Sequence, residues 1–114
     1  MNKRNAGNAS VAGVPSYIRA VGGVLTPADR KYLKQKLDQK LAKLGSAVLR
    51  ASVRVEDVNG PRGGVDKRCQ IKVVLRGLPS MVVAEHHRSV KGAMDSALAR
   101  TELAARRAIE RRRP

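Results

Sequence analysis

Aromatic residues are almost absent from this sequence of 114 residues, which has no Phe, no Trp, and only Tyr17 and Tyr32. Proteins that read single-stranded RNA base by base usually stack the bases on several aromatic side chains. Two tyrosines cannot form a platform of the usual kind, so we do not expect sequence-specific recognition of single strands. Any nucleic acid should instead be bound through its phosphates and its shape.

Cysteine and long apolar runs are also scarce. Cys69 is the only cysteine, so it cannot form an internal disulfide, which fits a reducing compartment. No run approaches the roughly 18 apolar residues of a membrane-spanning helix. The segment from Met1 to Val14 lacks the apolar stretch of a secretory signal. We therefore expect a cytoplasmic protein with no membrane partner.

Residues that could perform chemistry are few: the candidates are Asp66, Cys69, His86 and His87. Cys69 falls on the predicted inward face of a strand, where a free cysteine is commonly a small buried apolar residue. The adjacent histidines should point to opposite sides of a strand. No CxxC, paired-His or GxxxxGK spacing occurs. We therefore expect no enzymatic activity, no metal or cofactor site and no small-molecule substrate. The alternative hypothesis from a different functional class is that these residues form a metal or thiol site.

Positive charge dominates the composition. Lys and Arg number 24 against 9 Asp and Glu, so the formal net charge is +15. Self-repulsion of this size destabilises a compact domain, and a polyanionic partner would relieve it. The composition therefore predicts a nucleic-acid-binding protein. A general DNA- or RNA-binding regulator is a further alternative, although no helix-turn-helix or zinc-finger spacing appears.

The first half of the chain predicts a short strand and a helix. The strand covers Ser16 to Val21, with Ile18 and Ala20 on one face. The helix should begin at Thr26 as N-cap, with Pro27 at the first helical position and Asp29 in the first turn. It should end at Gly45. Its apolar stripe has spacings of four, four and three: Leu33, Leu37, Leu41 and Leu44.

Three strands and a second helix should follow. Residues 48–57 alternate, with Leu49, Ala51, Val53 and Val55 predicted to face inward. After a loop at residues 59–64, the inward set is Cys69, Ile71, Val73 and Leu75. The third strand covers Ser80 to His87, but its inward register stays open because residues 81–84 are all apolar. Ser89 should cap a last helix that runs to about Arg111.

This order of elements predicts an α+β domain of βαβββα type, with a four-stranded sheet and both helices packed on one face. The apolar arc of the last helix should supply its side of the core: Val90, Met94, Ala97, Leu98, Thr101, Ala104, Ala105, Ala108 and Ile109. We expect a single domain at residues 16–112, preceded by a flexible basic tail at residues 1–15.

Basic residues form rows on both helices, which we interpret as RNA-binding surfaces. One edge of the first helix carries Lys36, Lys40 and Lys43, and the other carries Arg30, Lys31 and Lys34. The last helix carries Arg100, Arg107 and Arg111 in one row. A merely solvated face usually mixes signs, and this chain offers few opposite pairs at four-residue spacing, such as Glu102 with Arg106. The outer face of the sheet is a second candidate surface, with Arg50, Arg54, Arg68, Lys72 and Arg76.

Three motifs in this order resemble the ribosome hibernation promoting factors, also called ribosome-associated translation inhibitors, of the sigma-54 modulation protein family. They are Leu25-Thr26-Pro27, Val53-Arg54-Val55-Glu56-Asp57 and Ser89-Val90-Lys91-Gly92-Ala93-Met94-Asp95. The resemblance covers about Tyr17 to Arg112. It implies a βαβββα domain that lodges in the decoding channel of the small ribosomal subunit. There it would contact 16S-type rRNA, overlap the messenger and transfer RNA sites, and silence idle ribosomes by occlusion.

The resemblance also implies where RNA would be contacted. The family's basic helix positions fall on Arg30, Lys36, Lys40, Lys43, Arg100, Arg107 and position 103, which is Leu in this chain. Leu103 therefore removes one expected phosphate contact. Nothing follows the last helix, so we expect neither the extra domain with which long members pair ribosomes nor a dimer of this chain.

Overall fold

The computed structural model describes residues 14–58 and 67–112, so the predicted loop at 59–64, Asp66 and residues 1–13 of the predicted tail lie outside it. Its elements follow the predicted βαβββα order: β1 (Ser16–Ala20), α2 (Pro27–Ala42), the short 3₁₀ helix η1 (Gly45–Ala47), β2 (Val48–Asp57), β3 (Lys67–Leu75), β4 (Met81–His87) and α3 (Val90–Arg112). The α+β prediction is confirmed.

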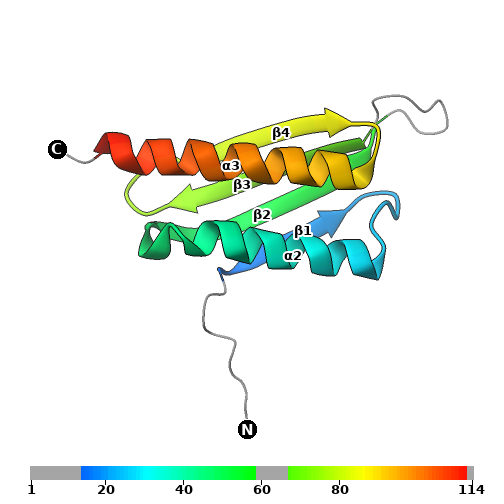
Figure 1. The fold of residues 1–114 in the computed structure, drawn as a ribbon, viewed down its shortest axis with the longest axis horizontal. Helices are drawn as coiled ribbons and strands as arrows, with labels where there is room; N and C mark the ends of the chain where they lie inside the picture. Colours follow the sequence, from blue (N-terminus) through cyan, green and yellow to red (C-terminus); the bar gives the residue numbers. More distant parts are fainter. Residues whose placement is uncertain (1–13, 59–66, 113–114) are drawn as a thin grey trace, which may run out of the picture.

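The four strands form one sheet in the order β1-β2-β3-β4. β1 pairs with β2 in parallel, and the other two pairs are antiparallel. A parallel pair needs a crossover, which α2 provides. Figure 1 shows both helices on the same face of the sheet, side by side and running in the same direction. This confirms the predicted two-layer arrangement, and no described helix covers the other face.

Local capping explains where the helices begin. Thr26 Oγ1 accepts a hydrogen bond from the Asp29 N–H, and Asp29 Oδ2 accepts one from the Thr26 N–H, both at 3.0 Å. This reciprocal capping box satisfies two amide groups that the first turn leaves free. Ser89 Oγ accepts from the Gly92 N–H at 2.9 Å and caps α3 with this single hydrogen bond. Both predicted N-caps are confirmed.

The core lies between the helices and the sheet. Leu33, Leu37 and Leu41 of α2 are fully buried, as is Cys69 of β3. From α3, the fully or almost fully buried residues are Ala93, Met94, Ala97, Leu98, Thr101 and Ala105. The packed region starts before β1, because Val14 is buried and the Pro15 carbonyl accepts a hydrogen bond from the Ala51 N–H at 3.0 Å.

The prediction that Leu49 faces inward is wrong. Leu49 is 36% exposed, whereas Val48 is 7% exposed and takes the place in the core. The pairing of β2 with β3 passes from Val48 with Leu75 to Arg50 with Val74, so Leu49 is an extra residue in a bulge. A bulge interrupts the alternation of a strand, which is why the pattern from Ala51 onward could not be extended back to Leu49.

The pairing of β4 with β3 resolves the register that the sequence left open. Met81 lies opposite Val73 and Val83 lies opposite Ile71, two buried residues, so Met81 and Val83 face the core. Val82 points to the open side of the sheet and is 55% exposed.

Within the described residues, no helix is both long and apolar enough to cross a membrane.

Candidate nucleic-acid interface

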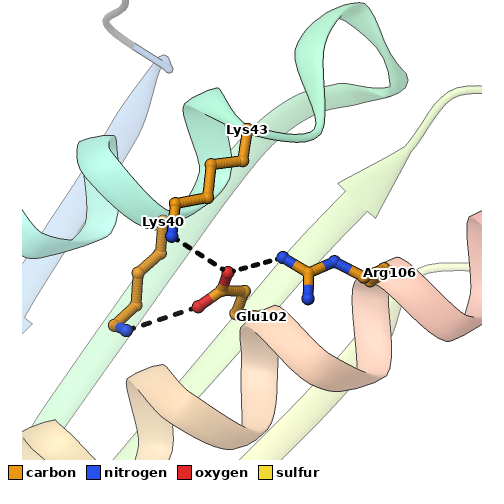
Figure 2. Close-up of polar contacts among 4 residues, drawn as sticks. All are labelled: Lys40, Lys43, Glu102 and Arg106. Atoms are coloured by element: carbon orange, nitrogen blue, oxygen red, sulfur yellow. Dashed lines mark hydrogen bonds and ion pairs between the residues drawn. The ribbon is translucent and has the colours of Figure 1, made fainter.

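Three cations converge on one carboxylate where α2 and α3 meet (Figure 2). Lys40 Nζ lies 3.3 Å and Lys43 Nζ 3.5 Å from the carboxylate oxygens of Glu102, and Arg106 Nη2 lies 2.8 Å away. Lys40 in the last turn of α2 and Lys43, the C-cap residue of that helix, lie on the side that faces α3. Glu102 and Arg106 are one turn apart on α3. We call these four residues the Glu102 cluster.

The carboxylate of Glu102 is the anion that holds this cluster together. Its side chain is only 14% exposed. Burial by itself raises the pKa of Glu102, but hydrogen bonds and charge from Lys40 and Lys43 outweigh burial and hold the pKa below its ordinary value. Glu102 is therefore ionised at neutral pH. With three cations against one anion, the cluster keeps an excess positive charge.

A second polar contact joins the helices nearer their N-terminal ends. Tyr32 OH donates a hydrogen bond to Asp95 Oδ1 at 2.6 Å, and Lys91 Nζ lies 3.3 Å from Asp95 Oδ2. The hydrogen bond to Asp95 and burial raise the pKa of Tyr32. Lys36 Nζ lies 5.8 Å from the centre of the Tyr32 ring, within range of a cation–π contact. Lys36, Lys40 and Lys43 therefore all lie along the seam between the helices.

The other predicted row of α2 is largely used within the fold. Arg30 Nη1 donates to the Ile18 carbonyl at 2.9 Å and so ties α2 to β1. Lys34 Nζ lies 3.0 Å from Asp38 Oδ1 in a pair one helical turn apart. Lys31 is exposed, and no ion pair joins it to a carboxylate of the described residues. Of this row, Lys31 is the most available to an outside ligand.

The predicted row of α3 lies at the opposite edge of the helix layer, beside β4. Arg100 Nη1 is 3.3 Å from Glu85 Oε2 of β4. Arg100, Leu103 and Arg107 line a shallow depression of about 290 Å³. Leu103 lies between the two arginines, and its side chain is 45% exposed. Arg111 lines a neighbouring depression of about 410 Å³. All three arginines are exposed, and Leu103 occupies the gap in their row.

The structure thus distributes the predicted residues over three strips of the helix layer and does not gather them into one patch. One strip is the seam between the helices, and the other two are the outer edges of α2 and α3. Sequence reasoning found the Glu102–Arg106 pair but did not include Arg106 among the candidate RNA ligands. Spacing within a single helix cannot show that Lys40 and Lys43 approach α3, because that depends on how the helices pack.

Of the residues considered for chemistry, the three that the structure describes, Cys69, His86 and His87, do not come together in a site. Cys69 is fully buried, and burial raises its pKa to about 12, so it carries a neutral thiol at pH 7. His87 Nδ1 accepts from the Ser89 N–H at 3.4 Å, and His86 points to the open face of the sheet, opposite Arg68. Across residues 14–58 and 67–112, no group of three His, Cys, Asp or Glu is placed to hold a metal ion.

Solved structures share this fold. The N-terminal domain of Protein Y from Thermus thermophilus superposes with a TM-score of 0.67 and 23% sequence identity, covering 82% of this chain and 97% of that one. A ribosomal subunit interface protein from Coxiella burnetii superposes with a TM-score of 0.68 and 14% identity, covering 82% and 96%. No curated protein matches the sequence.

The family comparison covers almost all of the described domain. The model of the family described as sigma 54 modulation protein / S30EA ribosomal protein matches residues 18–113. The matched range includes every strand and both helices except the first residues of β1. The resemblance expected from the motifs is thereby confirmed, and the chain belongs to the sigma 54 modulation protein / S30EA ribosomal protein family.

Proposed function

We propose that this chain is a ribosome-associated RNA-binding protein that occupies the decoding channel of the small subunit and silences idle ribosomes. The observation that carries the proposal is the family match over residues 18–113. One of the structures with this fold is a ribosomal subunit interface protein. The net charge of +15 suits a partner made largely of phosphate.

Binding would use the helix layer. Arg107 and Lys31 are exposed and have no ion pair among the described residues, so they can contact phosphates without breaking an internal contact. Lys40, Lys43 and Arg106 would exchange part of their contact with Glu102 for phosphate oxygens. Because phosphate contacts carry no sequence information, specificity for the ribosome would come from the shape of folded rRNA and the spacing of the three strips.

Inhibition would be by occlusion. A rigid domain seated in the channel excludes messenger and transfer RNA without any chemical step. The role therefore needs no cofactor, and the protein would act on the ribosome in a one-to-one complex, as a monomer. Occlusion requires that bound messenger RNA and this protein compete for the small subunit.

Sedimentation through a sucrose gradient with separated ribosomal subunits tests this function. The parent protein should move with small subunits, and excess duplex DNA should not remove it. Pre-bound messenger and initiator transfer RNA should displace it. If about six phosphates are contacted, log affinity should fall against log salt with a slope of roughly −4 to −5.

Matched variants locate the surface. Arg107→Gln should weaken small-subunit binding, because it removes an exposed cation of the α3 row. Arg88→Gln makes the same charge change at an exposed position just before α3, outside the three strips, and should bind like the parent. Co-sedimentation with large subunits only, or equal losses in both variants, would contradict the proposal.

A further inference from the structure

The face of the sheet away from the helices carries its own set of cations. Side chains from β1, β2 and β3 supply them: Arg19, Arg50, Arg54, Arg68 and Lys72. Among the described residues of this face, Glu56 is the one carboxylate. Neither α2 nor α3 lies over it, because both pack on the opposite side (Figure 1). We call this surface the open sheet face.

Most of the positive charge on the open sheet face is not neutralised by carboxylates of the described residues. Glu56 is shared by Arg54, at 3.5 Å, and Arg68, at 2.8 Å. No carboxylate of the described residues forms an ion pair with Arg19, Arg50 or Lys72. Arg19 also lies directly opposite Arg54 in the pairing of β1 with β2. Like charges directly opposite on neighbouring strands are destabilising, and a bound polyanion would relieve this repulsion.

An exposed aromatic ring lies among these cations. Tyr17 of β1 is 66% exposed, and it shares a cross-strand row with Ser52 and Lys72. Tyr17, Arg50, Ser52 and Lys72 line a depression of about 330 Å³ on the open sheet face. Proteins that bind single-stranded nucleic acid combine a stacking aromatic ring with cations that follow the backbone. The depression offers an aromatic ring, that of Tyr17, together with two cations, Arg50 and Lys72. Lys72 lies in the same cross-strand row as Tyr17.

We propose that the open sheet face is a second RNA-binding site, which takes a single-stranded segment with one base stacked on Tyr17 and the flanking phosphates on Arg50 and Lys72. A single ring stacks on any base, so binding is independent of sequence. Duplex RNA does not fit this role, because its bases are already stacked on one another.

This site is separate from the one proposed on the helices. The helix strips and the open sheet face are opposite surfaces of a thin molecule, whose Cα atoms extend 16 Å along the shortest axis. The chain can therefore hold one RNA segment on each side. Loss of one site leaves the other in place, so the two proposals fail independently.

Fluorescence anisotropy with a labelled oligouridine of about ten nucleotides tests the site, a length within the range that one small domain covers. Tyr17→Ala should weaken binding about fivefold or more, and Tyr17→Phe, which keeps the ring, should stay within about twofold of the parent. The double variant Arg50→Gln/Lys72→Gln should lower the slope of log affinity against log salt by about 1.4. The control Lys31→Gln/Arg107→Gln removes the same charge from the helix layer. It should bind the oligonucleotide more tightly than the sheet double variant.

Tyrosine fluorescence gives a direct readout of stacking. The chain has no Trp, and Tyr32→Phe leaves Tyr17 as its only tyrosine. Oligouridine should then quench the emission of that variant.

Thermal melting checks that each variant folds. The proposal is overturned if folded Tyr17→Ala binds as tightly as the parent, or if the helix-layer control weakens binding more than the sheet double variant. It also fails if the parent does not bind at physiological salt, which would leave the face to a protein partner. Subunit sedimentation reports on the helix layer separately.

Discussion

Replacing Glu102 by glutamine should change stability and RNA affinity in opposite directions. The substitution keeps the size of the side chain and removes the charge on which Lys40, Lys43 and Arg106 converge. The Arg106 contact spans one helical turn, a geometry worth about 0.3–0.5 kcal/mol. The Lys40 contact is more protected than the Lys43 contact, since the lysine side chains are 30% and 61% exposed.

The expected loss of stability is about 1 kcal/mol, because exposed ion pairs contribute roughly 0.2–1 kcal/mol each and are not additive. For a domain of this size, that lowers the melting temperature by about 4 °C or more. The loss should depend on pH. The pKa of Glu102 is lowered in the folded state, so its contribution is present above the ordinary value of 4.5 and disappears as the pH falls through the lowered value. Parent and Glu102→Gln should therefore converge in stability under acid conditions.

Affinity for the small subunit should rise. A phosphate bound to these cations would lie about 6 Å from the Glu102 carboxylate, where two like charges repel by roughly 0.7 kcal/mol in water and more near a protein surface. Removing that repulsion predicts binding about three- to tenfold tighter, measured by gradient sedimentation or filter binding at physiological salt. The matched control is Glu56→Gln, which makes the same charge change on the open sheet face, away from the helix layer, and should alter small-subunit affinity much less. Weaker binding by a folded Glu102→Gln would refute the reasoning and show that Glu102 positions the cations for RNA.

Two further predictions concern single residues. Leu103→Arg should fill the gap between Arg100 and Arg107, tighten small-subunit binding and steepen the salt slope by about 0.7–0.9, one phosphate contact; an unchanged slope would contradict docking in the family's orientation. Cys69 should resist iodoacetamide at pH 8 in the native protein and react after unfolding in urea, because it is buried and its pKa is raised to about 12. Mass spectrometry measures the extent of labelling in the native and the unfolded protein, and fast labelling of the native protein would disprove the burial of Cys69.

Much of the fold could be predicted because local signals agree with the tertiary structure. Thr26, Pro27 and Asp29 specify the start of α2 by themselves, and the leucine stripe needs only the helical period. The Leu49 prediction failed because a bulge depends on the partner strand. The register of β4 stayed open because every residue from 81 to 84 is apolar, so only pairing with β3 identifies the inward ones.

The candidate site was less predictable than the fold. The sequence identified the rows, since rows follow from spacing within one helix. It did not show that Glu102 contacts Lys40 and Lys43, more than 50 residues earlier, because that depends on how α2 and α3 pack. It also did not show which cations are already engaged, as Arg30 is with the Ile18 carbonyl.

The acidic residues clarify why so much positive charge remains available. Each described carboxylate except that of Glu110 has a contact within the fold. Asp29 caps α2. The other carboxylates contact cations or hydroxyl groups, and they belong to Asp38, Glu56, Asp57, Glu85, Asp95 and Glu102. The acids are thus used to fasten elements together, as Glu102 joins α2 to α3 and Glu85 joins β4 to α3. With 24 basic residues against 9 acidic ones, the cations left over cannot be neutralised by any rearrangement of the chain itself. Those on the exposed strips, such as Arg107 and Lys31, and those around Tyr17 are accessible to an external anion, and their positions on opposite faces fit the two RNA segments that we propose.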